Sequence, residues 1–192
     1  MEYLSPLLWR RVMRYLAIVF TSFFMCGSSL AASVTATSIP DLADAINQRF
    51  EVMKDVAGYK LANGLPVEDL PREEKVLRQT QHFADAAKLD PLSVEGFIHA
   101  QMMVSKAIQY RYLDRWRIKP ENNWQPKSLQ TVREQILKLD NRILDLISQQ
   151  LLVGGGFSHP QTEALRQELD GKQISEWEKT VLIDYLVRIK RQ

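Results

Sequence analysis

The sequence predicts an all-α protein: one helical domain of about six helices that follows an export signal. Three observations predict this fold class. Apolar residues recur every three or four positions in each long segment after about residue 40, as in a helix with one buried face. Residues that cap or break helices stand at the ends of these segments, and no segment alternates in the manner of a strand. The 192 residues are 45% hydrophobic and 25% charged, which is typical of a globular domain.

The predicted helices are bounded by residues that favour helix ends. They span about residues 41–62, 70–88, 94–118, 131–153, 160–169 and 176–191. Breaks are predicted at Asn63-Gly64, Asp90-Pro91, Pro120 and Gly154–Gly156, and N-caps at Ser38, Ser93 and Ser175. Thr131 and Glu134 have the spacing of a capping box, so the fourth helix is predicted to start there.

An export signal is predicted at the N-terminus. A basic start, residues 10–14, precedes an apolar run and then small side chains at the positions that a signal peptidase reads. We expect cleavage after Ala31 or Ala32, which leaves residues 32–192 as the mature domain, in the periplasm or secreted. The apolar run is shorter than the roughly 20 residues of a spanning helix. An uncleaved anchor is therefore the weaker alternative, and no membrane association is expected after cleavage.

Charge and cysteine content exclude further classes of protein. The formal net charge is +2, and residues 1–31 carry three Arg and one Glu, so the mature domain is near neutral. A nucleic-acid surface would need clustered basic charge, and none is expected here. The only cysteine, Cys26, leaves with the signal, which removes disulfides and thiol chemistry from the mature chain.

Polar side chains interrupt the apolar stripes of two predicted helices. In the first helix, Arg49 and Lys60 occupy positions where a core residue is expected. Their separation is almost three helical turns, so both point the same way, about 16 Å apart along the axis. In the third helix, Ser105 and Gln109 lie one turn apart on an otherwise apolar face. A single such residue is more often structural, because long side chains extend their heads into water.

Four cations that converge on one interior need a different explanation. Arg72 and Arg133 join Arg49 and Lys60 on apolar stripes, whereas few carboxylates share those faces; Asp69 and Glu73 are the nearest. Because buried charges must be paired, the missing negative charge is expected from a ligand. The sequence therefore predicts a pocket for a small molecule with about two carboxylates.

The chemistry that the sequence lacks is also informative. The three histidines are scattered, with no metal-binding motif, so no metal is expected. The glycines at 154–156 lack the context of a phosphate-binding loop, and no Ser-His-Asp or Cys-His set indicates a nucleophile. An enzyme of this kind would need no cofactor and would act by binding, orientation and electrostatic stabilisation.

Across about residues 40–150 the chain resembles the all-helical (type II) chorismate mutases, and its export signal and length resemble their secreted gamma subclass. The resemblance is carried by four stretches: NQRFEVMKDVAGYK, LPVEDLPREEKVL, VSKAIQ and LQTVREQILKLDNRILDLI. It implies the intramolecular Claisen rearrangement of chorismate to prephenate, a step of the shikimate pathway in aromatic amino acid biosynthesis. It places the catalytic pocket within about residues 40–150, and it assigns no role to the C-terminal helices, residues 157–192.

The resemblance also implies roles for eight residues. Arg49 and Arg133 would bind carboxylates with help from Ser105, and Lys60 and Gln109 would donate to the ether oxygen. Arg72 would support the end of the site that holds the ether oxygen. Asp69 and Glu73 would hold the ring hydroxyl.

Arg133 lies late in the chain, so one chain is expected to complete its own pocket, whether the protein is a monomer or a homodimer. Two features depart from some secreted relatives: no C-terminal cysteine pair is present, and position 109 is Gln instead of Glu. Two alternatives stay open from the residues alone. One is an exported helical module that binds an aromatic dicarboxylate without turnover, and the other is a lyase that releases pyruvate from isochorismate.

Overall fold

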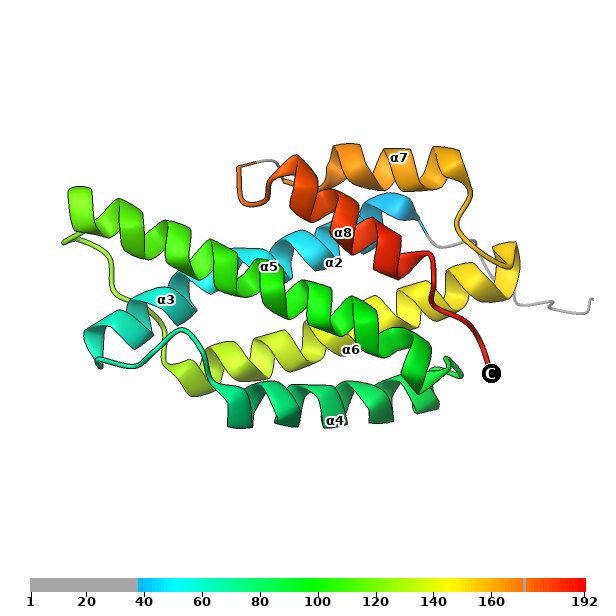
Figure 1. The fold of residues 1–192 in the computed structure, drawn as a ribbon, viewed down its shortest axis with the longest axis horizontal. Coiled ribbons are helices and arrows are strands. Elements are labelled where there is room, and N and C mark those ends of the chain that lie inside the picture. Colours follow the sequence, from blue (N-terminus) through cyan, green and yellow to red (C-terminus); the bar gives the residue numbers. More distant parts are fainter. Residues whose placement is uncertain (1–37, 171) are drawn as a thin grey trace, which may run out of the picture. The chain divides into compact units, whose positions relative to one another are not determined.

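The computed structural model describes residues 38–170 and 172–192, all within one compact unit (Figure 1). The predicted export signal, residues 1–31, lies outside the described residues. Within them lie seven helices: α2 Ile39–Glu51, α3 Met53–Ala62, α4 Leu70–Ala86, α5 Pro91–Ile118, α6 Leu129–Gly154, α7 His159–Glu168 and α8 Glu176–Leu186. The all-α prediction is confirmed.

The first predicted helix is interrupted once, at Val52. The ψ angle of Val52 is −9°, and its N–H reaches the Gln48 carbonyl oxygen only at 3.4 Å, so the regular helix ends and restarts there. Helices α2 and α3 together therefore correspond to one predicted helix. The helical path continues through Val52, because the Val52 N–H still reaches the Gln48 oxygen and the Val56 N–H reaches the Val52 oxygen at 3.2 Å, but these hydrogen bonds are long.

Two predicted helix starts were wrong. Helix α6 begins after Ser128, whose Oγ accepts the Thr131 N–H at 3.1 Å, so the capping box at Thr131 does not form. Helix α5 begins after Asp90, whose carboxylate accepts the Leu92 N–H, and not after Ser93. In both places a nearby residue with equal capping ability lies three positions earlier.

The last helix ends five residues earlier than predicted. Ser175 caps α8 and forms a capping box with Glu178, as the sequence indicates, but the helix stops at Leu186. The chain then pairs with the α4–α5 turn: Asp90 N–H donates to Lys190 O at 2.8 Å, and Gln192 N–H donates to Lys88 O at 3.1 Å. This tertiary pairing replaces the last helical turn.

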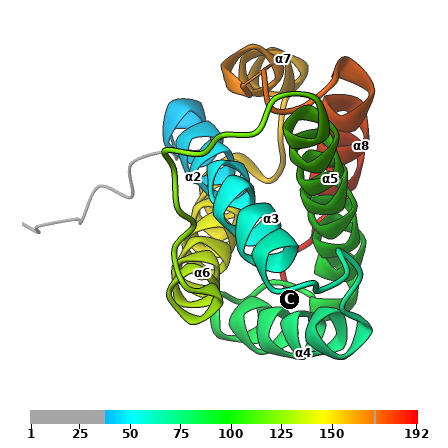
Figure 2. The same cartoon turned by 90° about the vertical axis from the view of Figure 1, so that its left-hand side faces the viewer.

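Helices α3, α4, α5 and α6 surround the interior that becomes the site. Helix α3 packs on α5 and α6, and α4 packs on the same two helices from the other side (Figure 2). Helices α7 and α8 pack on α2 and α5 respectively, and on each other. The apolar core includes fully buried Phe50, Phe97, Ile98, Ile143 and Ile147. None of the described helices combines the length and the apolarity that crossing a bilayer would require.

Candidate active site

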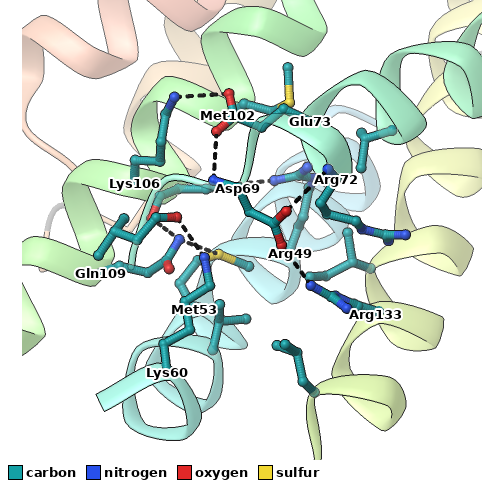
Figure 3. A pocket seen from close by; sticks show the side chains of 16 residues that line it. Arg49, Met53, Lys60, Asp69, Arg72, Glu73, Met102, Lys106, Gln109 and Arg133 are labelled. Carbon is teal, nitrogen blue, oxygen red and sulfur yellow. Dashed lines mark hydrogen bonds and ion pairs between the residues drawn. The ribbon is translucent and has the colours of Figure 1, made fainter. Parts of the chain in front are cut away.

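One pocket contains all eight residues that the sequence singled out. It occupies about 620 Å³ when the open space at its mouth is included. The eight residues on its wall are Arg49, Lys60, Asp69, Arg72, Glu73, Ser105, Gln109 and Arg133 (Figure 3). Positions up to 84 residues apart in the chain are thus brought to one interior. The pocket wall also contains Lys106 and apolar side chains that were not among the predicted site residues: Met53, Val56, Val67, Val76 and Met102.

Arg49 is held by two buried partners. Its Nε donates to Asp140 Oδ1 at 2.6 Å, and its Nη1 donates to Ser105 Oγ at 2.8 Å. Ser105 in turn donates to the Gln101 carbonyl oxygen at 2.7 Å. Arg49 is 3% exposed and Asp140 is 2% exposed, so the ion pair is almost entirely removed from water. These contacts orient the guanidinium while leaving Nη2 without a partner among the described residues.

Asp140 corrects the expectation that Asp69 and Glu73 are the carboxylates nearest to the buried cations. It lies one turn after Ile136 and two turns after Arg133, on the buried side of α6. That spacing was a signal in the sequence, since a charged residue on an apolar stripe needs a partner. Arg49 therefore has an internal counter-ion.

Arg133 also has a partner. Its Nη2 donates to Asp69 Oδ2 at 2.9 Å, and both side chains are about one third exposed at the mouth of the pocket. The other oxygen of Asp69 accepts the Arg72 N–H at 3.2 Å and caps α4. Asp69 thus anchors the start of one helix to a cation near the start of another (Figure 3).

Lys60 has no carboxylate partner within bonding distance among the described residues. Its Nζ donates to the Val67 carbonyl oxygen at 2.5 Å, and the residue is buried. Burial lowers the pKa of Lys60 below its usual value of 10.5; nearby Asp69 opposes this shift, and Arg133 adds to it. An ammonium has three donors, so two remain for a ligand.

Arg72 is half-buried, and no acceptor binds its guanidinium among the residues described. Burial lowers its pKa, with a further lowering from Arg133 that Asp140 and Asp69 oppose. An arginine stays charged under such a shift. Arg72 is therefore a desolvated positive charge without a direct partner.

Glu73 pairs with Lys106, which was not among the predicted site residues. Lys106 Nζ lies 3.0 Å from Glu73 Oε2, and Glu73 Oε1 accepts the Asp69 N–H at 3.5 Å. Lys106 lies one position after Ser105 on α5, and nothing in the sequence distinguished it from the solvent-facing lysines. The pair fixes the Glu73 carboxylate at the pocket wall.

Gln109 lies one turn after Ser105, as predicted. Its Nε2 donates to the Ser105 carbonyl oxygen at 3.1 Å and lies 3.9 Å from Met53 Sδ. Its Oε1 is buried with no hydrogen-bond partner among the described residues. A buried amide normally has its hydrogen-bonding groups satisfied, so the pocket presents an amide with unused capacity.

The pocket as a whole carries excess positive charge. Five cations and two carboxylates line it, and Asp140 behind Arg49 adds a third carboxylate. The remaining excess of two positive charges matches a dianion. Among the described residues, no three potential metal ligands come together. This arrangement is suited to binding a small dicarboxylate and stabilising charge that develops on it.

Known proteins similar to this chain are chorismate mutases. Residues 40–110 match the family model for chorismate mutase type II. A monofunctional chorismate mutase from Enterobacter agglomerans is 44% identical over 178 residues, which cover 93% of this chain and 98% of that protein. A secreted chorismate mutase from Yersinia pestis is 42% identical over 134 residues, covering 70% of this chain and 69% of that protein.

The fold agrees with the same family. The crystal structure of the secreted chorismate mutase from Yersinia pestis matches this structure with a TM-score of 0.74 at 32% identity, over 79% of this chain and 98% of that one. The chain belongs to the all-helical, type II chorismate mutase family, and it is an isomerase. This confirms the family that the residue pattern resembles.

Replacing Asp140 with Asn should destabilise the fold strongly, because the buried Arg49 charge would lose its counter-ion. Breaking a buried pair typically costs about 3–5 kcal/mol. Chemical denaturation would measure the change in the free energy of unfolding. Asp145→Asn is the control, since Asp145 lies on the same helix but faces solvent. Equal stability of the two variants would show that the pair contributes little.

Proposed function

We propose that this pocket binds chorismate and holds it in the compact conformer from which it rearranges to prephenate. The observation that carries the proposal is the excess of two positive charges over a partly apolar wall, which complements a small dianion with a hydrocarbon ring. The rearrangement is intramolecular and transfers no proton to the protein. The pocket therefore needs only to orient the substrate and to stabilise developing charge.

Arg49 and Arg133 are proposed to bind the two carboxylates. A guanidinium is planar and can meet a carboxylate through two parallel hydrogen bonds. Arg49 keeps Nη2 unused while Asp140 and Ser105 hold its other nitrogens. Arg133 uses only Nη2 toward Asp69, which leaves Nη1 and Nε for the substrate. Arg72, which the resemblance assigned to the ether-oxygen end, lies near Arg133 (Figure 3), and it is proposed instead to add its unpaired positive charge at the carboxylate end.

Lys60 and Gln109 are proposed to donate to the ether oxygen, which gains negative charge as its bond to the ring breaks. Both line the pocket, on the side that lies away from Arg133 in Figure 3. Lys60 keeps two N–H donors, and Gln109 keeps one N–H that lies near only a weak sulfur acceptor. Donors aimed at charge that appears in the transition state lower the barrier more than they strengthen ground-state binding.

Asp69 and Glu73 are proposed to hold the ring hydroxyl. Glu73 lies between Lys106 and the Asp69 N–H, so its carboxylate is oriented before substrate arrives. A carboxylate accepts a hydrogen bond from a hydroxyl without further adjustment.

We propose that residues 1–31 are a signal peptide and that the mature enzyme acts in the periplasm or outside the cell. The pattern of basic, apolar and small residues supports this, as do the names of two relatives, secreted chorismate mutases from Yersinia pestis and Mycobacterium tuberculosis. All eight proposed site residues come from one chain. The activity is therefore proposed not to depend on whether the chain forms a homodimer.

The direct test follows chorismate consumption together with prephenate and pyruvate formation by the purified mature chain. Prephenate in equal amount to the chorismate lost is expected. Binding without loss of chorismate would instead indicate a binding module. A second assay supplies isochorismate. Release of pyruvate from it, with no prephenate formed from chorismate, would indicate a lyase.

Arg133→Ala should nearly abolish turnover while the melting temperature stays close to that of the wild type. Arg133 is only half-buried, and its pair with Asp69 is partly exposed, so its loss should cost little stability. Because one chain supplies the whole pocket, wild-type specific activity should also hold steady on dilution. A steep loss on dilution would mean that a second chain completes the site.

Lys60→Ala should lower kcat much more than it raises KM. Loss of one donor to developing charge typically costs about 3–4 kcal/mol of barrier. Lys60→Arg should restore little, because a planar fork does not replace a compact ammonium in a tight site. If KM alone rises, Lys60 serves as an anchor for a carboxylate.

Turnover should be nearly level with pH from about 5 to 8, because arginine and lysine stay charged there. Above this range kcat/KM, which reports the free enzyme, should fall as Lys60 loses its proton, and the fall should begin below the usual lysine value because burial lowers the pKa of Lys60 in the empty site. Gln109→Glu should turn the level region into a decline with rising pH, since an ionised carboxylate repels the developing charge. The comparison is kcat against pH at saturating chorismate. Superimposable profiles would show that residue 109 does not contact the ether oxygen.

A further inference from the structure

The connection between α5 and α6, residues 119–128, runs past α3 on its way to the start of α6 (Figure 1). Trp124 is its anchor. The Trp124 ring stacks on Trp116 of α5, with centroids 5.5 Å apart and planes at 27°. The Lys54 ammonium of α3 lies 4.4 Å from the centroid of the same ring. Trp124 is thus held between two helices.

The Trp124 ring packs directly on the backbone of α3 at Gly58. A Cβ at position 58 would lie 2.6 Å from Trp124 Cζ3 and 2.7 Å from Cη2, closer than real side chains approach. It would also lie 3.3 Å from Pro126 Cβ. Gly58 has ordinary helical backbone angles, so what it provides is room for the ring. The contact therefore sets how close the connection and α3 approach.

Polar contacts fasten the connection to the same side of α3. Lys54 Nζ lies 2.9 Å from Glu121 Oε2, and Glu121 also accepts the Trp116 Nε1–H at 3.1 Å. One turn away from Gly58, Asp55 accepts the Lys127 N–H at 3.1 Å. The connection is thus bonded to the first turn of α3 through residues that precede and follow Trp124 in the sequence.

The pocket lies on the opposite side of α3. At 3.6 residues per turn, Gly58 is roughly 160° around the helix axis from both Val56 and Lys60. Val56 and Lys60 line the pocket together with Met53. The hydrogen bonds across Val52 are stretched to 3.4 Å and 3.2 Å, so α2 holds the direction of α3 less firmly than a regular helix would. The contact at Gly58 therefore lies where it can determine how far the Lys60 side chain extends into the pocket.

We propose that Trp124 is a positioning residue. By packing on Gly58 it holds α3 close to α5 and α6, and so it sets how far the Lys60 ammonium extends into the pocket. Trp124 does not line the pocket and acts through α3. The inference rests on the proposed role of Lys60 at the ether oxygen. The position of α3 matters for catalysis because a misplacement of a catalytic group by about 1 Å can reduce the rate by about 100-fold.

The first test compares Trp124→Ala with Trp177→Ala, a control on α8 whose ring is 64% exposed. Trp124→Ala should lower kcat by about 10- to 100-fold, with KM changed much less, whereas Trp177→Ala should match the wild type. Gly58→Ala is the second variant. It keeps the Trp124 ring and favours the helix, but the new Cβ would crowd the ring at 2.6 Å and force α3 and the ring apart. The melting temperature should fall somewhat through this crowding, and kcat should also fall at temperatures where the variant is fully folded.

The decisive test is a double-mutant cycle between Trp124→Ala and Lys60→Ala. If Trp124 acts through Lys60, removing the ring should cost little kcat once Lys60 is alanine. Equal losses from Trp124→Ala in both backgrounds would overturn the inference, as would wild-type kcat in both Trp124→Ala and Gly58→Ala. If Lys60→Ala itself left kcat unchanged, the assigned role of Lys60 would fail first, and this inference with it.

Discussion

The buried ion pair between Arg49 and Asp140 is the interaction on which the site depends. It joins α2 to α6, and the hydrogen bond from Arg49 to Ser105 extends it to α5. Removing two charges from water is costly, and a partner of good geometry is needed to offset that cost. The pair is therefore sensitive to any displacement of these three helices. It also leaves one edge of the guanidinium free, in a fixed orientation.

Two other cations of the site, Lys60 and Arg72, are arranged less favourably for the empty protein. Lys60 bonds only to a backbone carbonyl, and no acceptor meets the Arg72 guanidinium among the described residues. Burial lowers the pKa of both groups, which means that the surroundings disfavour their charge. A bound dianion, as proposed above, would relieve this by pairing with their charge. The packed helices hold the cations there because their apolar faces are buried elsewhere in the core.

Chain layout explains how one chain can supply every wall of the pocket. Arg133 stands near the start of α6, directly after the α5–α6 connection that grips α3. The connection therefore leads from the side of α3 opposite Lys60 to the helix that carries Arg133. Helix α7 packs on α2 and α8 packs on α5, and the last residues pair with the α4–α5 turn. These C-terminal contacts brace the helices whose inner faces form the site.

Local periodicity was enough to indicate the helices approximately and to single out six pocket residues as polar side chains on apolar stripes: Arg49, Lys60, Arg72, Ser105, Gln109 and Arg133. The other two, Asp69 and Glu73, were singled out as the nearest carboxylates and by the resemblance. The partners were decided by tertiary structure. Asp140 was recognisable only as a charge on a stripe, and the pairing of Lys106 with Glu73 had no signal in the sequence. The start of α6 at Ser128 and the end of α8 at Leu186 depended on choices between nearly equal local alternatives. Local preferences of a few tenths of a kcal/mol to about 1 kcal/mol are small beside the energy of packing, so the folded neighbours, and not the local sequence, select among them.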